Sequence, residues 1–298
     1  MAQQQELLDL CQQGSLIEAE KLAVSITCDF ASSGFGWKIL AVILAQTGRA
    51  SEALEASRRA AELLPQDPEV QNNLGIVLQL LGRLESARCA YEKAIAIQPG
   101  YAEAFTNLGA VLERMGKFAA AEASYRSALD LRIDSAEAHN NLGVILHKLL
   151  RPAEAEASYR LAISLNSEYA VAHSNLGIVL QELGRSDEAK ECYARSVELD
   201  PGSAEGQYNL GFVLQQRGCL EEATRRYQRA IALRPRFVEA YRGLVDITNG
   251  KVSTLQLREM EAAYSDGKMA LGQRAQICFA LARVEERQRS FAKAFRYY

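Results

Sequence analysis

The sequence NNLGIVLQLLGR at residues 72–83 returns four more times at steps of 34 residues, as TNLGAVLERMGK, NNLGVILHKLLR, SNLGIVLQELGR and YNLGFVLQQRGC. A fixed period of this length predicts a stack of similar units in place of one globular core. Every copy contains an asparagine, although asparagine is a mediocre helix former. We therefore expect this asparagine to make a hydrogen bond that offsets its low helix propensity.

The repeat becomes regular when the leucine of NLG is numbered position 7, which places six units at 34–67, 68–101, 102–135, 136–169, 170–203 and 204–237. Position 7 is always leucine, position 20 is always alanine, and position 8 is alanine once and glycine five times. A glycine inside a helix costs about 1 kcal/mol relative to alanine, so we expect position 8 to permit a close approach of two helices. Position 24 is expected to fill the space between successive helix pairs with an aromatic ring. Its tyrosines are Tyr91, Tyr125, Tyr159, Tyr193 and Tyr227.

Two further positions mark the ends of the predicted helices. Position 15 carries the glycines expected just after the first helix of a pair, namely Gly48, Gly82, Gly116, Gly184 and Gly218. Position 32 carries the prolines expected to end the second helix, namely Pro65, Pro99, Pro201 and Pro235. Each unit is therefore predicted to be a pair of antiparallel helices.

Composition narrows the class of protein. The chain has 298 residues, 48% of them hydrophobic, with only 6 prolines, which is typical of an ordered, helix-rich protein. A net charge of −3 gives no general attraction for nucleic acid, and the arginines between Arg225 and Arg242 are interleaved with glutamates, as on a solvated face. The longest apolar run, residues 39–45, is too short to insert into a membrane, and the N-terminus lacks a signal sequence, so we expect a cytoplasmic protein.

Catalytic and metal-binding motifs are absent from the sequence. The 6 cysteines have no metal or CxxC spacing, and among the 3 histidines His139 and His173 share position 4 with Trp37, which favours a packing role. No nucleophile triad, HExxH, P-loop or GxGxxG motif is present. We expect no cofactor, no metal and no enzyme activity from these residues.

The pattern of Trp37, Leu40, Ala53, Ala60 and Pro65, repeated with tyrosine at position 24, resembles the tetratricopeptide repeat. This resemblance implies an all-α, right-handed superhelical solenoid of antiparallel helix pairs. It extends to a divergent capping unit at residues 1–33 and six regular units at 34–237. Residues 238–274 are expected to be degenerate, with TNGKVSTLQL interrupting the second helix, and 275–298 to begin a further, truncated unit.

One stripe of the first helix has the composition of a binding surface. Positions 2, 6, 9 and 13 share a helix face, and in tetratricopeptide repeat proteins the first helices line the concave groove. The predicted groove residues are Asn73, Asn107, Asn141, Asn175 and Asn209 at position 6, Arg114, Lys148, Glu182 and Gln216 at position 13, and Phe212 at position 9.

The asparagines allow two interpretations. A carboxamide can hold a peptide N–H and C=O together, and the arrangement resembles the asparagine ladder of the repeat domain of protein O-linked N-acetylglucosamine transferase, which implies an extended peptide ligand. Alternatively, each asparagine bonds within its own chain and only spaces the repeats. The glutamates at position 2 either stabilise their helices by interacting with the positive end of the helix dipole or select a basic peptide. Apolar residues at position 9 argue against the subclass that clamps a terminal carboxylate.

The sequence therefore predicts a scaffold that binds a protein or an extended peptide. The segments FGWKILAVILAQTGRASEAL and FALARVEERQRSFAKAF are similar to bacterial tetratricopeptide proteins with a downstream sulfotransferase-like domain. One alternative is thus the targeting or assembly region of a larger sulfotransferase- or glycosyltransferase-like enzyme. The other is a module that self-associates, as a homo-oligomer, through its terminal helices.

Overall fold

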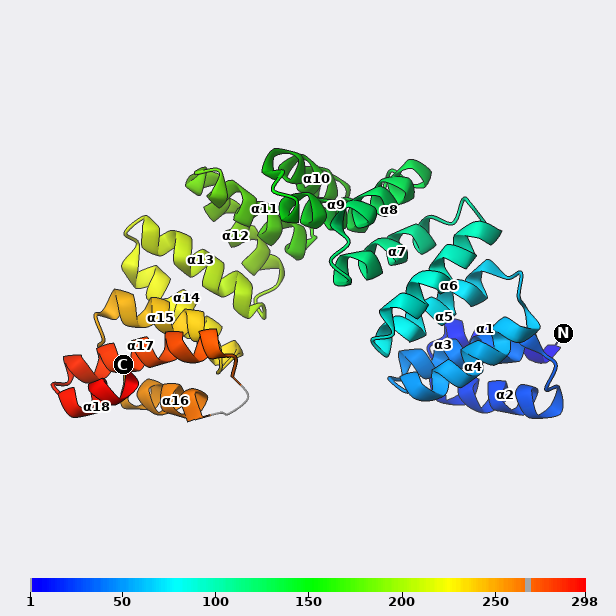
Figure 1. The fold of residues 1–298 in the computed structure, drawn as a ribbon, viewed down its shortest axis with the longest axis horizontal. Coiled ribbons are helices and arrows are strands. Elements are labelled where there is room, and N and C mark those ends of the chain that lie inside the picture. Colours follow the sequence, from blue (N-terminus) through cyan, green and yellow to red (C-terminus); the bar gives the residue numbers. More distant parts are fainter. Residues whose placement is uncertain (1, 266–268) are drawn as a thin grey trace. The chain divides into compact units, whose positions relative to one another are not determined.

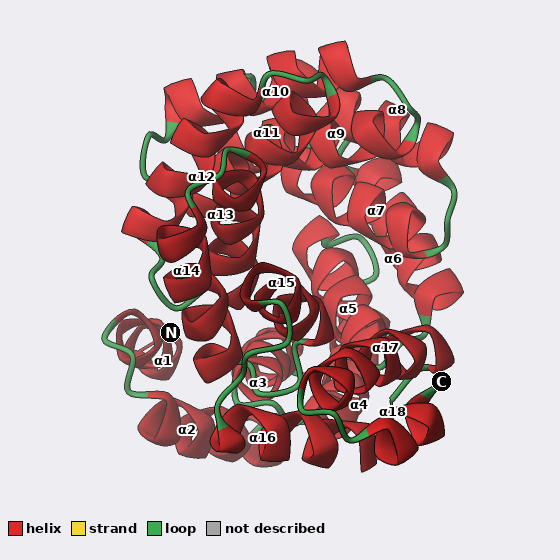
Figure 2. Ribbon diagram, turned by 90° about the vertical axis from the view of Figure 1, so that its left-hand side faces the viewer, coloured by secondary structure: helices red, strands yellow, loops and turns green. Residues whose placement is uncertain are grey.

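The computed structural model describes residues 2–265 and 269–298, and all regular secondary structure in these residues is α-helical (Figure 2). The chain forms two compact units, a first half that ends at Arg151 and a second half that begins at Pro152. We describe each half by itself.

The first half contains nine helices (Figure 1). They are α1 (Ala2–Gln12), α2 (Leu16–Asp29), α3 (Gly34–Gln46), α4 (Ala50–Leu63), α5 (Pro68–Leu80), α6 (Leu84–Ile97), α7 (Ala102–Arg114), α8 (Phe118–Leu131) and α9 (Ala136–Lys148).

The second half continues the same pattern with nine helices in the residues that the structure describes. They are α10 (Pro152–Leu165), α11 (Ala170–Glu182), α12 (Ser186–Leu199), α13 (Ala204–Gln216), α14 (Leu220–Leu233), α15 (Val238–Thr248), α16 (Thr254–Ser265), α17 (Leu271–Arg287) and α18 (Phe291–Tyr297).

The helix boundaries of α3 to α14 follow the repeat numbering without a slip. First helices occupy positions 1–13 and second helices positions 17–30 in all six units. The glycines at position 15 have φ between 72° and 78°, so the predicted glycine just beyond the first helix is confirmed. Unit 136–169 has Leu150 at this position, and its φ of 60° places a leucine in the left-handed region.

Proline is not what fixes the end of the second helix. The helices α4, α6, α12 and α14 end two residues before the prolines of position 32. However, α8 and α10 end at the same position, although the residues two places later are Ile133 and Ser167. The packing of the following helix therefore sets this boundary, and proline only conforms to it.

The glycine of position 8 and the tyrosine of position 24 form a contact inside each unit. A Cβ atom added to Gly75 would lie 2.5 Å from Cε1 of Tyr91, and one added to Gly109 would lie 2.7 Å from Cε1 of Tyr125. The prediction that small residues allow two helix backbones to touch needs correction, because a tyrosine ring occupies the space. The same ring also reaches the next unit, since a Cβ on Gly243 would lie 2.5 Å from Cζ of Tyr227.

The first helices lie next to one another within each half. Helix α5 contacts both α3 and α7, α7 contacts α9, and α13 contacts α15, while α4, α6, α8, α12 and α14 each pack between two first helices. First helices of successive units therefore approach closely, which places them on the inner side of each curved stack. The all-α fold of antiparallel helix pairs is confirmed, and its right-handed superhelical sense stays a prediction.

The two ends of the chain differ from the regular units. Helices α1 and α2 form a pair that packs on α3, and Ala19 and Ala23 at positions 20 and 24 are fully buried. At the other end, α15 ends at Thr248, residues 249–253 form the turn, and α16 begins in register at Thr254, position 17. The stretch TNGKVSTLQL therefore separates the two helices and does not interrupt the second one, in contrast to what the sequence had led us to expect. Helix α17 packs against α15, α16 and α18, and residues 266–268 of the predicted degenerate segment lie outside the described residues.

Candidate peptide-binding groove

The stripe along the first helices has a constant exposure from unit to unit. Every asparagine of position 6 and every apolar residue of position 9 is half-buried, whereas positions 2 and 13 are exposed from residue 68 to 237. Asn73, Asn107 and Asn141 lie in the first half, and Asn175 and Asn209 in the second. The amides are thus neither sealed between helices nor fully surrounded by solvent.

The asparagines differ in their hydrogen bonds. Asn107 donates from Nδ2 to Oδ1 of Asn72 at 3.0 Å, and Asn141 accepts from Nδ2 of Asn140 at 3.3 Å. Asn175 also has a partner. Asn73 and Asn209 have no partner among the residues that the structure describes. Asn107, Asn141 and Asn175 are therefore suited to a spacing role within the chain, whereas Asn73 and Asn209 are suited to binding a ligand.

The buried Asn72 links two units through its carboxamide. Its Oδ1 accepts from Asn107, and its Nδ2 donates to Oε1 of Glu103 at 3.3 Å. Because Asn72 has no exposed surface, it depends on these partners to satisfy its polar atoms. The sequence reasoning concentrated on position 6 and missed this residue at position 5, although NN pairs occur in two of the five copies.

Position 13 reaches back to the preceding unit in the first half. Arg114 donates from Nη1 to the backbone oxygen of Gln79 at 3.2 Å, at the C-terminal end of α5. The Nζ of Lys148 lies 2.7 Å from Oε1 of Glu113 and 5.4 Å from the centre of the Phe118 ring. These two cations are exposed yet already engaged, so a ligand would have to share or replace their partners.

Position 13 in the second half is held by Glu182 and Gln216, both exposed. Glu182 has an interaction partner of its own. Phe212, one turn before Gln216, lies with its ring centre 6.2 Å from that of Tyr208 in a stacked arrangement. The structure therefore brings Phe212 and Gln216 together on one face of α13, beside Asn209.

Two cavities open beside the asparagines of the first half. One of about 240 Å³ between α3 and α5 has apolar walls, including Val42 and Ile76, and Asn73 lies at its edge. The other, of about 250 Å³, is polar and includes Asn107, Glu103 and Glu137. Arg132 also lines this second cavity, so the groove offers an apolar compartment and a polar one with charges of both signs at neighbouring units.

The glutamates of position 2 sit in the first turn of their helices and also join units. Lys38 at position 5 lies with its Nζ 2.9 Å from Asp67 and 2.5 Å from Glu69. Burial alone would lower the pKa of Lys38, but the hydrogen bonds from Lys38 to Glu69 and Asp67 raise it above its ordinary value. Glu69 is therefore partly neutralised, which weakens its preference for a basic peptide.

Position 4 carries a repeated contact that the sequence reasoning did not recognise. The polar side-chain atoms of five position-4 residues lie 2.9–3.3 Å from the backbone oxygen six residues earlier. They are Trp37, His139, His173, Gln207 and Tyr241. The predicted packing role of His139 and His173 therefore has a definite form, in which an N–H at Nε2 donates to the turn between units.

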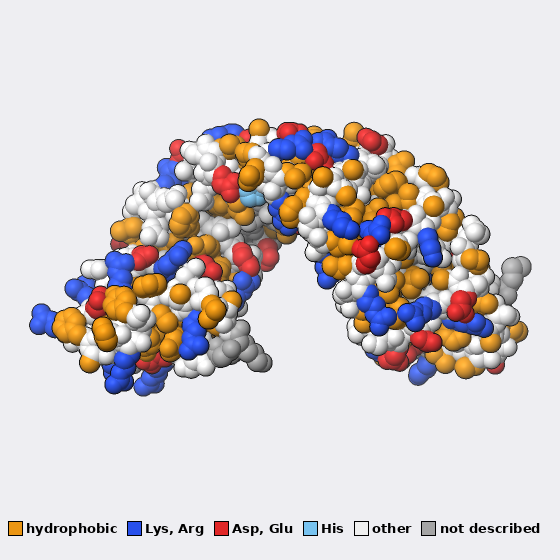
Figure 3. Space-filling model, viewed as in Figure 1, with side chains coloured by type: hydrophobic (Ala, Val, Ile, Leu, Met, Phe, Trp, Pro, Cys, Tyr) orange, Lys and Arg blue, Asp and Glu red, His pale blue; other side chains and the backbone are white. Residues whose placement is uncertain are grey.

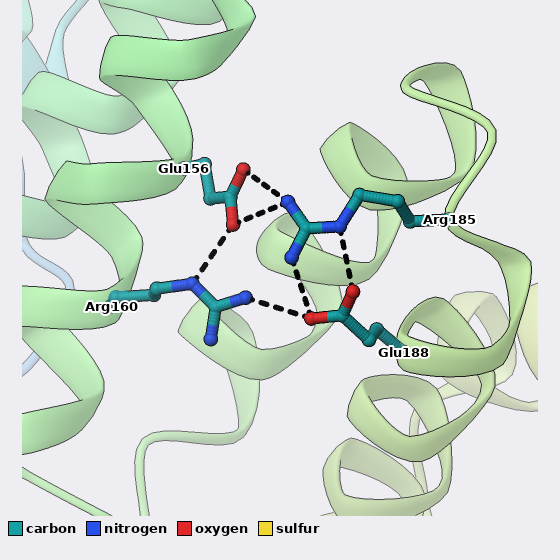
Figure 4. Close-up of polar contacts among 4 residues, drawn as sticks. All are labelled: Glu156, Arg160, Arg185 and Glu188. Carbon is teal, nitrogen blue, oxygen red and sulfur yellow. Dashed lines mark hydrogen bonds and ion pairs between the residues drawn. The ribbon is translucent and has the colours of Figure 1, made fainter.

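The outer face is held by ion pairs between second helices (Figure 4). Nη1 of Arg185 lies 2.8 Å from both carboxylate oxygens of Glu156, and Arg185 and Arg160 also contact Glu188. Partial burial acts to raise the pKa of Glu156, but hydrogen bonds from Arg160 and Arg185 hold it below its usual range. Charges of both signs are interspersed over the face shown in Figure 3.

Other kinds of site find no support in the described part of the chain. Residues 2–265 and 269–298 contain no group of three or more His, Cys, Asp or Glu placed to hold a metal ion. The helices among these residues include none that is both long and apolar enough to cross a bilayer.

Comparison with known families identifies the repeat. Tetratricopeptide repeat models match residues 37–100, 134–201 and 90–123, and a TPR repeat model matches residues 114–149. Together the matches run without a gap from residue 37 to 201, more than half of the chain. No curated protein sequence matches the chain.

Several solved structures are similar. YrrB, a TPR protein with an unusual peptide-binding site, is 28% identical over 63% of this chain and 96% of its own, with a TM-score of 0.51. MamA is 27% identical over 54% of this chain and 94% of its own, with a TM-score of 0.50. PilF of Pseudomonas aeruginosa shares the fold at 18% identity, over 73% of this chain and 97% of its own, with a TM-score of 0.65. The resemblance to the glycosyltransferase repeat domain and to proteins with a sulfotransferase-like domain stays a prediction.

Proposed function

Because the chain belongs to the tetratricopeptide repeat family and is a protein-interaction scaffold, we propose that it binds an extended peptide along the first helices of each half. The observation that supports this most is the uniform half-burial of position 6: each asparagine stays partly accessible, and hydrogen bonds within the chain orient the side chains of Asn107 and Asn141. A rigid, partly exposed carboxamide can pair with a peptide backbone at a small entropic cost.

The proposed division of labour follows from the chemistry of the stripe. The asparagines would hold the peptide backbone and so read no sequence. Positions 9 and 13 would select the side chains, since position 9 is apolar throughout and position 13 changes from Arg114 and Lys148 to Glu182 and Gln216. The similarity to YrrB is consistent with a peptide ligand for this surface.

The experiment is a selection from a random peptide library on the intact chain, followed by affinity measurements on the recovered peptides. Asn73→Ala and Asn209→Ala should each weaken binding, because each removes a carboxamide whose hydrogen bonds are not used by other described residues. At about 1 kcal/mol for each net hydrogen bond, each substitution should raise the Kd of the peptide that binds to its own half about fivefold.

Matched controls separate binding from stability. Gln98→Ala with Gln228→Ala removes two exposed amides that lie outside the groove stripe and should leave Kd unchanged. Asn107→Ala should lower stability as well as affinity, because it removes the hydrogen-bond donor to Oδ1 of the buried Asn72. If Asn73→Ala and Asn209→Ala leave Kd unchanged, the asparagines are spacers and the peptide-groove proposal is wrong.

A second candidate function, self-association, is favoured by exposed aromatic residues at the last helix pair. Phe279 of α17 and Phe291 and Phe295 of α18 are more than 60% exposed, unlike the buried rings of the regular units. Light scattering over a range of concentrations tests it: Phe291→Ser with Phe295→Ser should abolish any rise in mass. A mass that is constant and monomeric in the native chain would exclude this candidate.

A further inference from the structure

In every unit from residue 68 to 237, the tyrosine of position 24 is buried. In the units at 68–101, 170–203 and 204–237, this tyrosine lies against the glycine of position 8, and its hydroxyl donates to a glutamine at position 12 of the first helix. The Oη of Tyr91 lies 3.0 Å from Oε1 of Gln79, and that of Tyr227 lies 2.6 Å from Oε1 of Gln215. The ring, the glycine and the amide together close the space between the two helices.

The unit at 34–67 has none of these three residues. Ser57 replaces the tyrosine, Ala41 replaces the glycine, and Ala45 replaces the residue that accepts from the tyrosine hydroxyl. Ser57 is only 2% exposed, and its hydroxyl has no hydrogen-bond partner among the described residues. A small polar residue therefore occupies a place that the rest of the stack fills with a ring.

The apolar cavity beside Asn73 occupies the corresponding region. Its walls include positions 8 and 12 of this unit, Ala41 and Ala45, and position 6 of the next unit, Asn73. Tyr227 shows what lies there when the tyrosine is present, because its ring touches position 8 of its own unit, Gly211, and position 6 of the next, Gly243. Ser57 itself does not line the cavity, but the cavity shares position 8 of its own unit and position 6 of the next with the surroundings of the Tyr227 ring, and Val42, Ile76 and Gln46 add the groove positions 9 and 13.

A second, separate cavity of about 640 Å³ lies at the same pair of units, and its lining includes Ala61 and Leu74. Leu74 is half-buried, whereas the position-7 leucines of the other five units are buried. Position 28 is Ala61 here, and it is Ile, Leu or Val in the other units. The seam between the units at 34–67 and 68–101 is therefore the loosely packed one.

We propose that this cavity binds an aromatic side chain of the peptide ligand, a phenyl or phenol ring, in the place of the missing tyrosine. Its volume of about 240 Å³ is sufficient, because an apolar cavity of about 150 Å³ already holds benzene. Val42, Ile76 and Val77 supply apolar walls. Asn73 and Gln46 supply amides at its edge, where the backbone on either side of the ring would lie. This inference rests on the proposed peptide-binding function.

The first experiment uses small probes and does not need a known ligand. Toluene and p-cresol are titrated into methyl-labelled protein, and the NMR signals of Val42, Ile76 and Val77 should shift and saturate together. The variant Ala41→Gly, Ala45→Gln, Ser57→Tyr restores the residues of the other units and should abolish the shifts. Ala45→Leu, which fills the cavity with one change, gives the same test if the triple variant folds poorly. Unchanged shifts in a folded, filled variant, or no shifts in the native chain, would overturn the proposal.

The second experiment separates this inference from the proposed function. Acetylated, amidated pentapeptides Gly-Gly-Phe-Gly-Gly and Gly-Gly-Ala-Gly-Gly are compared on the native chain. The phenylalanine peptide should bind about tenfold to a hundredfold more tightly, as expected for burial of an aromatic ring. Equal affinities that both fall in Asn73→Ala would refute the cavity and keep the groove. Probe binding with no peptide gain and no effect of Asn73→Ala would keep the cavity and refute the groove.

Discussion

The contact between Gly75 and Tyr91 gives a prediction in which two physical effects oppose each other. In an exposed helix, Gly75→Ala should stabilise the protein by about 1 kcal/mol, because alanine loses less backbone entropy on folding. Here the new Cβ would lie 2.5 Å from Cε1, 2.7 Å from Cδ1 and 2.8 Å from Cζ of the Tyr91 ring. We therefore expect the substitution to destabilise the protein.

The magnitude follows from how far the ring must move. Tyr91 is fully buried and its hydroxyl is held by Gln79, so the ring cannot swing into solvent, and overpacking of this kind costs about 1–3 kcal/mol. Taking the upper value and subtracting the gain in helix propensity leaves a net loss of about 2 kcal/mol. At Gly211 the nearest atoms of Tyr227 would be 3.0 Å away, so the same substitution there should be close to neutral.

The assay is urea denaturation followed by circular dichroism, with Gly75→Ala, Gly211→Ala and the double variant Gly75→Ala, Tyr91→Ser. The double variant reproduces the pair that the unit at 34–67 already has, Ala41 and Ser57. It should be more stable than the sum of the two single effects predicts, because the alanine no longer meets a ring. An increase in stability for Gly75→Ala would show that helix propensity decides at this position and would refute the packing argument.

Three more substitutions test other features of the structure. Leu150→Gly should stabilise the protein by about 0.5–1 kcal/mol, because it relieves a left-handed backbone that glycine adopts freely, and thermal denaturation will show it. Glu285 is 1% exposed and stands where the six regular units have leucine; neither of its carboxylate oxygens is hydrogen-bonded within the described residues, and its ion pair with Lys293 is long, at 4.0 Å. Urea midpoints should therefore rise in the order Glu, Gln, Leu, with a gain of about 1–3 kcal/mol for Glu285→Leu, and a lower midpoint for Leu would contradict this. The lowered pKa of Glu156 means that its contribution is present above the ordinary glutamate pKa of about 4.3 and is lost as the pH falls through the lower value of the folded state. Arg185→Ala should therefore lose less stability on acidification than the native chain, and parallel acid titrations of both would refute this.

Much of the fold could be predicted because the repeat imposes the same local interactions many times. Position 15 needs a left-handed backbone, which glycine adopts most readily, and position 20 is fully buried and occupied by alanine in every unit. Both requirements can therefore be recognised from the type of residue that recurs. The period then places every first helix of the six units at positions 1–13 and every second helix at positions 17–30. The second helix of the unit at 238 was misjudged because TNGKVSTLQL contains helix-breaking residues that fall in a turn, where they do no harm.

The site was harder to predict, because a repeated residue can serve the stack or the ligand and the sequence does not say which. The sequence placed the asparagines on one stripe but gave no sign that Asn107 bonds Asn72 or that Lys148 pairs with Glu113. Those contacts join residues about one period apart, and they depend on the side-chain conformations of two units at once. The hydrogen bond of His139 to the backbone oxygen of Ile133, six residues earlier, could not be predicted from residue types either, because every residue has a backbone oxygen.

The units of a repeat protein need similar interfaces in order to stack, but discrimination between ligands needs interfaces that differ from unit to unit. The tyrosine and glycine that fill the space between the helices of a regular unit are therefore poor places for specificity, since changing either one leaves a hole or a clash. In the unit at 34–67 both residues change together. Ala41 faces no tyrosine ring, because Ser57 is small, and the remaining space is the cavity lined by Ala41, Ala45 and the groove residues Val42 and Asn73. If a ring binds there, the ligand itself supplies the missing packing, so binding should stabilise the unit at 34–67 against local unfolding more than any other unit. Hydrogen exchange with and without a phenylalanine peptide measures this directly: protection gained evenly along the chain would show that the cavity has no special role.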